Sequence, residues 1–493
     1  MKLKKIIFKI LLLSIIIILL FNNKNIDYKK NKKIVYTNIN KIKKKKIYKN
    51  KNNLSLLLIF PFIILLFMIA TGPIFYQNFW HKNYIKISIL ISISICIYYI
   101  IYLNSLFKIL ITLIEYIQFI LLILVLYISS GGIFIEINKK INSKINLLIL
   151  FFGSCISNLI GTTGASIILI RPYIKINKKN IKPYHIIFFI FIISNIGGGL
   201  TPIGDPPLFL GFLKGVPFFW TLKNNFLPWV FSLTILGLFF YIIDFKNHVN
   251  IKNKIKKDKK PYILIYGGRN FFWLIIITIS IFLENKIFHF IPDIKYNSHS
   301  ISFIREIIII LIILFLYKNA NKYAFKKNKF NFKPLEEICF VFIAIFISIL
   351  PILEIINNLA QSNKFINIIN YNTLYWSTGL LSGFLDNAPT YLNLLNAIMS
   401  TYDANIHNVE NVKLYTKGIY SINNILELKA ISIASVFFGA LTYIGNGPNF
   451  IVKSIAEKYG IKMPSFFEYI IYFSIPFLMP VLIVIWLLFF YIN

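Results

Sequence analysis

Long apolar runs follow one another along almost the whole chain, and this feature restricts the possible folds more than any other. The runs are about 17–25 residues long, the length a helix needs to cross the ~30 Å hydrocarbon core of a bilayer. Short polar segments separate them, and they continue to the C-terminus. Only 14% of the 493 residues are charged and 57% are hydrophobic. The sequence therefore predicts an all-α polytopic membrane protein.

The apolar runs are predicted to be helices, although several are short for a full span. Short runs that stop at clusters of Gly, Pro or Asn indicate re-entrant hairpins or interrupted helices. The predicted helical runs are Leu54–Thr71, Tyr84–Leu103, Ile109–Ile128, Ile145–Ile160, His185–Leu200, Trp229–Ile243, Phe271–Leu283, Ile307–Tyr317, Ile338–Leu353, Leu374–Leu385, Ile425–Leu441 and Tyr469–Tyr491.

Four segments organise the chain. The first segment contains the apolar run Lys5–Phe21. No small-residue cleavage site follows this run, so an uncleaved span or anchor is favoured there over a signal peptide. The segments are 1–53, with the apolar run Lys5–Phe21 and a basic stretch; 54–243, the first transmembrane half; 244–333, basic loops and connecting spans; and 334–493, the second transmembrane half.

The net charge of +35 does not indicate a nucleic-acid partner. Lys and Asn are frequent in every segment, as expected from a nucleotide bias of the kind found in reduced bacterial genomes, and no basic face belongs to a soluble module. Basic loops also bind lipid head groups, so the expected partner is the bilayer. The three cysteines and six histidines show no metal-ligand spacing, and no cofactor or bound metal is expected.

Two pairs of polar segments interrupt the apolar runs, one member of each pair in each half. The later pair shares Thr, Ile, Gly and a final Pro, which sets Asp205 opposite Asn446. The pairs are Gly161–Ser166 with Asp386–Tyr391, and Thr201–Pro207 with Thr442–Pro448.

Such breaks favour an ion or substrate site. Gly and Pro interrupt a membrane helix and free backbone groups, which must be buried in protein or turned to a water-filled cavity. Half-helix N-termini then attract anions, and exposed carbonyls bind cations. Kinks that only permit close helix packing are the alternative explanation.

Asp205 and Asp386 are the leading candidates for ion-binding residues, because a carboxylate at membrane depth is costly and usually functional. Either could instead cap its broken helix.

With these motifs the sequence resembles the ion transporter superfamily, in particular its branch of NhaD-type sodium/proton antiporters and citrate transporters. The resemblance covers about Leu54 to the C-terminus. It implies an inverted repeat of two halves, each with a scaffold part and a transport part, and a chain that can form homodimers. The motifs are Ile160–Ser166 with Leu169–Pro172, Ser194–Trp220, Trp376–Tyr391, Tyr443–Asn449 and Met463–Phe467.

The resemblance also implies which residues bind the transported ion. By motif, the hairpin tips would contribute Thr162, Thr163, Asp386, Asn387 and Thr390. The broken helices would contribute Asn195, Thr201, Asp205, Thr442 and Asn446. Outside these motifs, Glu115 is a further acid inside a predicted span.

The predicted function is a secondary active transporter of the bacterial inner membrane, a sodium/proton antiporter rather than an enzyme. A carboxylate can bind Na⁺ when ionised and a proton when not, and that competition is the simplest antiport mechanism. A cation-coupled symporter of citrate or another carboxylate is the alternative. An intramembrane aspartyl protease with Asp205 and Asp386 as its dyad is a third reading. Such enzymes have Gly-x-Gly-Asp, whereas Pro202-Ile-Gly-Asp205 lacks the first Gly.

Overall fold

The computed structural model describes most of the chain from residue 55 to residue 491. The predictions for residues 1–53 and for Asp386 lie outside the described residues. The ranges not described inside this part are 139–141, 179, 250–261, 282, 284–290, 293, 297–298, 302, 329, 361–369 and 385–386.

Helices make up most of both halves, and several are longer than the apolar runs that predicted them. α8, for example, extends the predicted run 229–243 at both ends and contains Pro228. Helices of the first half are η2 (Leu56–Ile59), α2 (Phe60–Phe75), α3 (Gln77–Ile101), α4 (Leu106–Gly131), α5 (Ser143–Ile176), α6 (Pro183–Ile192), η3 (Ile196–Gly198), α7 (Pro206–Lys214) and α8 (Phe218–Val249).

The remaining helices run from the connecting segment to the C-terminal end of the described chain. They are α9 (Arg269–Ser280), α10 (Ile304–Lys318), α11 (Lys322–Lys327), α12 (Lys333–Ala360), α14 (Tyr371–Phe384), α15 (Asn387–Thr401), α16 (Val409–Thr416), α17 (Asn424–Phe437), η5 (Phe438–Leu441), α18 (Gly447–Lys458), α19 (Phe466–Tyr469), η6 (Ile470–Leu478), α20 (Met479–Trp486) and η7 (Leu487–Tyr491).

Two short antiparallel sheets correct the expectation of a purely helical chain. β1 (Phe134–Asn138) pairs with β2 (Tyr262–Tyr266), and β3 (Ile294–Tyr296) pairs with β4 (His299–Ile301). Aromatic and β-branched residues are frequent in the first pair, as is usual in strands. Residues 262–266 lie in the segment 244–333, which was predicted to contain basic loops and connecting spans. The fold is otherwise all-α.

Seven helices in the described part of the chain are long and apolar enough to cross a membrane, by length and composition. Together with the predicted runs, they identify a multi-pass membrane protein. These candidate spans are Asn78–Ile101, Leu106–Gly131, Ser143–Ile176, Phe218–Asn247, Leu335–Ile355, Asn424–Leu441 and Phe466–Tyr491.

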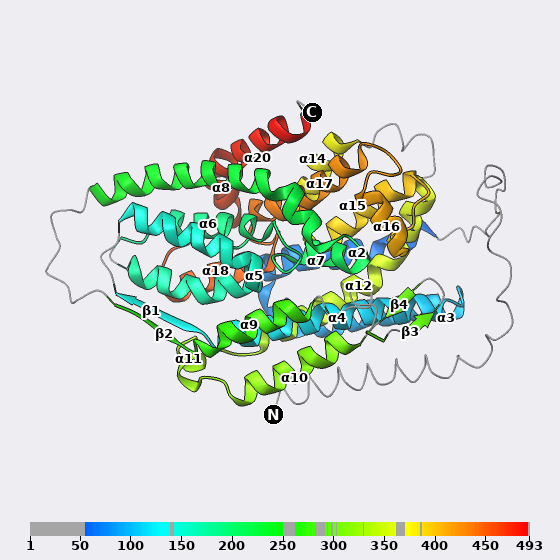
Figure 1. Cartoon of the computed structure of the whole chain (residues 1–493), viewed down its shortest axis with the longest axis horizontal. Helices are drawn as coiled ribbons and strands as arrows, with labels where there is room; N and C mark the ends of the chain where they lie inside the picture. Colours follow the sequence, from blue (N-terminus) through cyan, green and yellow to red (C-terminus); the bar gives the residue numbers. More distant parts are fainter. Residues whose placement is uncertain are drawn as a thin grey trace.

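The helices form two groups that pack against each other (Figure 1). We call α3, α4, α9, α10 and α12 the scaffold helices; α4 packs on α9, α10 and α12, and α12 packs on α3. The broken-helix group contains α5 to α8 and α14 to α18. Contacts of α4 with α5 and of α12 with α15 join the two groups. The sites described below lie within the broken-helix group or between the two groups.

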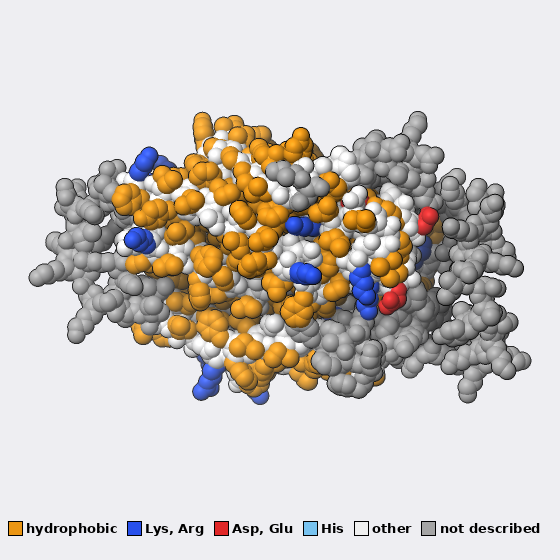
Figure 2. Space-filling model, turned by 45° about the horizontal axis from the view of Figure 1, so that its top comes forward, with side chains coloured by type: hydrophobic (Ala, Val, Ile, Leu, Met, Phe, Trp, Pro, Cys, Tyr) orange, Lys and Arg blue, Asp and Glu red, His pale blue; other side chains and the backbone are white. Residues whose placement is uncertain are grey.

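Apolar side chains cover much of the described part of the face shown in Figure 2. Among the exposed apolar residues of the chain, Leu90, Phe152, Phe219 and Leu311 are each more than 60% exposed. A protein surrounded by lipid can present such a surface because the acyl chains are as apolar as the side chains. Polar side chains are instead buried between the helices, where Asp205, Asn195, Asn387 and Asn446 are each no more than 3% exposed.

Candidate functional site

Helix α5 doubles back on itself at Gly161. This glycine has φ +79° and ψ 152°, a conformation that side chains with a Cβ rarely adopt. Asn146 near the start of α5 and Asn177 just after its end exchange two side-chain hydrogen bonds of 2.9 Å. A straight helix of 34 residues would hold its ends roughly 50 Å apart. α5 is therefore a helical hairpin with Gly161 at its tip.

Two stretches of non-helical backbone lie where the sequence predicted linkers, at 201–205 and 442–446. They are shorter than predicted, because α7 begins at Pro206 and α18 at Gly447. The prolines thus belong to the first turns of these helices, where a missing N–H leaves no intrahelical bond unmade. Asp205 and Asn446, both in extended conformation, are the N-cap residues of α7 and α18.

A threonine hydroxyl fixes each break in the same way. In the first break, Thr201 Oγ1 donates to the carbonyl of Asn158 at 2.6 Å and accepts from the N–H of Gly204 at 3.2 Å. In the second, Thr442 Oγ1 donates to the carbonyl of Gly383 at 2.6 Å and accepts from the N–H three residues later at 3.1 Å. Both threonine hydroxyls therefore hydrogen-bond to backbone and hold the loop conformation of their breaks.

Close backbone approach explains why glycines occur in both breaks. A Cβ atom at Gly204 would lie 2.2 Å from the carbonyl oxygen of Gly198. A Cβ atom at Gly445 would lie 2.6 Å from the carbonyl oxygen of Gly439. No side chain fits at such distances unless the backbone moves. The two breaks therefore share the same loop packing as well as the same threonine.

The carboxylate of Asp205 lies where the tip of the α5 hairpin, the start of α15 and both breaks meet. Its Oδ1 accepts a hydrogen bond from the Thr162 hydroxyl at 2.8 Å and from the Asn446 amide at 3.0 Å. Its Oδ2 accepts from the Asn387 amide at 2.6 Å. Thr162 follows the tip of α5, and Asn387 is the first residue of α15. These three donors are neutral, so they orient the carboxylate without cancelling its charge.

A chain of asparagine side chains continues from this carboxylate. The Asn446 amide also donates to Asn195 Oδ1 at 3.2 Å, and Asn195 donates to Asn449 Oδ1 at 2.7 Å. Asn449 donates in turn to the carbonyls of Gly439 and Thr442, at 2.8 and 2.9 Å. The network joins residues of the two halves and positions the amide that contacts Asp205.

Unused acceptor oxygen and free space lie near the carboxylate. Asn387 Oδ1 is buried and has no hydrogen-bond partner among the described residues. A cavity of about 50 Å³ adjoins Asp205 and is lined by Thr162, Thr163 and Tyr127, among others. A buried acceptor without a donor is costly unless a cation or water binds it. Oxygen donors of this kind are the ligands that small cations prefer.

The structure gathers five of the ten predicted site residues in one hydrogen-bonded cluster: Thr162, Asn195, Asp205, Asn387 and Asn446. Thr163 lines the cavity without belonging to this cluster.

Thr390 lies elsewhere, in the wall of a larger apolar cavity of about 560 Å³ that also touches α2 and α14. Thr201 and Thr442 bind backbone, and Asp386 lies outside the described residues.

Two residues of this region were not predicted as site residues. Asn158 Oδ1 accepts a hydrogen bond from the N–H of Leu200 at 3.0 Å, and its carbonyl accepts from Thr201. An asparagine inside an apolar run, three positions before Gly161, was the available signal. Asn449 ends the second motif and carries the link to Asn195, which sequence reasoning cannot assign because it joins residues 254 positions apart.

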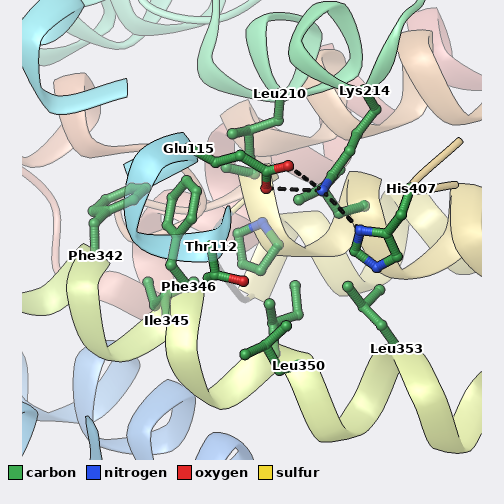
Figure 3. A pocket seen from close by; sticks show the side chains of 14 residues that line it. Thr112, Glu115, Leu210, Lys214, Phe342, Ile345, Phe346, Leu350, Leu353 and His407 are labelled. Atoms are coloured by element: carbon green, nitrogen blue, oxygen red, sulfur yellow. Dashed lines mark hydrogen bonds and ion pairs between the residues drawn. The ribbon is translucent and has the colours of Figure 1, made fainter. Parts of the chain in front are cut away.

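A second polar cluster lies between the scaffold and broken-helix groups (Figure 3). Lys214 Nζ, at the end of α7, donates to both oxygens of Glu115 on α4, at 2.7 and 2.8 Å. Nδ1 of His407 lies 3.4 Å from the same nitrogen. Lys214 is only 5% exposed. Glu115 was noted from the sequence as an acid inside a predicted span, but its partner was not.

The comparison with known protein families agrees with this architecture. Residues 51–490 match the model of a family described as "Putative citrate transport". No curated protein matches the chain. The match includes the α5 hairpin, both breaks and the scaffold helices, and so confirms the citrate transporter side of the predicted resemblance. The chain belongs to this citrate transport family and is a membrane transporter.

Proposed function

We propose that this transporter exchanges Na⁺ for H⁺ and that Asp205 is the group for which the two ions compete. The observation that carries the proposal is the buried Asp205 carboxylate, held by Thr162, Asn387 and Asn446. A carboxylate inside a membrane protein usually marks an ion pathway. Neutral donors from both halves place it without neutralising it.

The competition follows from the chemistry of the carboxylate. When ionised, Asp205 binds Na⁺, and Asn387 Oδ1, which has no hydrogen-bond partner among the described residues, offers a further oxygen without adding charge. When protonated, the carboxyl group no longer attracts the cation. One site thus carries either ion but not both, which couples their movements in opposite directions. The proposal needs no cofactor.

The matching contacts support an inverted repeat. Ser157 on α5 donates to a carbonyl just before η3 at 2.9 Å, and Ser382 on α14 donates to a carbonyl just before η5 at 2.6 Å. The threonine and glycine contacts of the two breaks match in the same order. We infer that α5 to α7 and α14 to α18 are equivalent units, whose hairpins would enter the bilayer without crossing it and meet near its midplane.

Citrate symport is the second candidate, favoured by the description of the family. The N-termini of α7, α18 and α15 converge near Asp205, and such termini also attract carboxylates. The site geometry favours a small cation, however. A cavity of about 50 Å³ has room for a few water-sized groups at most, whereas citrate has the volume of several waters.

Reconstituted protein decides between the candidates. The purified chain in liposomes with an internal pH dye is given a Na⁺ gradient, and labelled citrate uptake is measured in parallel. Na⁺-driven proton movement without citrate uptake is the expected result. Two results together would overturn the antiport proposal: citrate uptake that requires Na⁺ or H⁺, and no Na⁺-driven proton movement when citrate is absent. The role of Asp386, homodimer formation and the bacterial inner membrane as location stay predictions.

A further inference from the structure

We propose that Lys214 and Glu115 form the releasable contact between α7 and the scaffold helix α4, and that this contact positions Asp205 during transport. The inference rests on the proposed function only in that α7 carries the ion site. Lys214 acts through the helix and is a positioning residue, since Asp205 lies at the other end of α7.

Helix α7 connects the two clusters rigidly. Asp205 is its N-cap and Lys214 its last residue, so nine helical residues, roughly 14 Å, separate the ion site from the ion pair. Gly215, with φ +121°, then turns the chain toward α8. Alternating access requires one bundle to move against the other. If α7 moves against α4, Lys214 must leave Glu115.

The surroundings of the pair are suited to release. Figure 3 shows Lys214 between Glu115 and His407, above apolar residues of α12 such as Phe346 and Leu353. Lys214 is buried and the Glu115 side chain is 20% exposed, so the cost of desolvating the charges offsets part of their attraction. The adjoining cavity, about 20 Å³, has room for one water that can solvate the ammonium group. His407 Nδ1 offers a second acceptor on the broken-helix side.

A neighbouring ion pair provides the matched control. Lys108, two turns before Glu115 on α4, contacts Glu354 of α12 at 2.8 Å. Both helices belong to the scaffold, so this pair joins elements that would not separate. The two pairs share helix α4, residue types and distance. They differ in whether they connect the scaffold to α7 and in burial, because the Lys108 side chain is 47% exposed and the Lys214 side chain only 5%.

The test compares Glu115→Gln, Lys214→Met and the charge-swapped double variant E115K/K214E with the control Glu354→Gln. Spin labels replace exposed Leu227 on α8 and Leu311 on α10, in a background lacking the three native cysteines. Pulsed electron spin resonance in liposomes then measures the distances between the two groups. Both single variants should change the ratio of distance populations about tenfold, the effect of losing a charge-assisted hydrogen bond.

The charge swap should restore the wild-type ratio, and Glu354→Gln should leave it unchanged. In exchange assays, Glu115→Gln should alter turnover more than the KM for Na⁺, because Glu115 does not contact Asp205. Distances in Glu115→Gln identical to those in Glu354→Gln would overturn the proposal. If Lys214→Met does not fold, the isosteric Glu115→Gln variant and the charge-swapped double variant still test the proposal. The distance measurements require no ion-exchange assay. A failure of the Na⁺/H⁺ exchange proposal can therefore be distinguished from a failure of the proposal on Lys214 and Glu115.

Discussion

The two breaks have the same construction but different charge. Each has a threonine that bonds backbone, a pair of glycines in close approach and an N-cap residue in extended conformation. The N-cap is Asp205 in the first break and Asn446 in the second, and the two side chains are hydrogen-bonded at 3.0 Å. The two breaks therefore have the same backbone geometry. Of their two N-cap residues, however, only Asp205 carries a carboxylate. One such charge suits a monovalent cation or a proton.

The largest effect should come from removing that charge. Asp205→Asn keeps the size of the side chain, but the amide can neither titrate nor attract a cation. Na⁺-dependent proton movement should therefore fall to the background of vesicles without the transporter. Exchange in everted vesicles at several pH values measures this, and size-exclusion chromatography in detergent checks that the variant is folded. Wild-type exchange with unchanged pH dependence would show that Asp205 is only a helix cap.

Moving the charge to the other break tests whether the two breaks are equivalent. The double variant D205N/N446D should recover part of the exchange lost in Asp205→Asn. The single variant Asn446→Asp should place two carboxylates in contact, which then share a proton. Its exchange should need a more alkaline pH than that of the wild type. If D205N/N446D remains as inactive as Asp205→Asn, the geometric match does not extend to ion binding.

Removing the donor on α5 and the donor at the start of α15 sharpens the comparison further. Asn387→Ala and Thr162→Val each delete a hydrogen bond to the Asp205 carboxylate, a loss of about 1.5–3 kcal/mol. The KM for Na⁺ should rise roughly tenfold or more, since 1.4 kcal/mol corresponds to a factor of ten. Asn387→Ala should have the larger effect, because it also removes the acceptor Oδ1, which has no partner among the described residues. Equal KM values for wild type and both variants would contradict this role.

The smallest effects concern the loop packing that the breaks share. Gly204→Ala and Gly445→Ala should each lower the free energy of unfolding by about 1–3 kcal/mol, because a Cβ there meets a carbonyl oxygen. Gly447→Ala is the control, since its added Cβ would meet no non-neighbouring atom of the described residues within 4 Å. Unfolding temperatures in detergent measure all three. A tolerated alanine at one break and not the other would show that the two loops pack differently.

Local signals predicted the helices and the breaks but not the lengths or partners. The apolar runs located α3, α4 and α12, and the Gly and Pro clusters located 201–205 and 442–446. The β1–β2 pair was missed, because its strands are more than 100 residues apart and each is short. The two hydrogen bonds between Asn146 and Asn177 that close the α5 hairpin depend on the turn at Gly161, which periodicity cannot reveal.

The sequence by itself determined that this chain lies in a membrane, where its helices break, and which polar residues accompany the breaks. Those properties follow from local composition, since bilayer thickness sets helix length and Gly or Pro ends a helix. Tertiary structure alone decided that Asp205 contacts residues 182 and 241 positions later, and that Thr201 and Thr442 bind backbone. It also decided that Lys214 pairs with Glu115. Such contacts depend on how distant helices pack, because no local pattern encodes which buried donor will reach a given carboxylate.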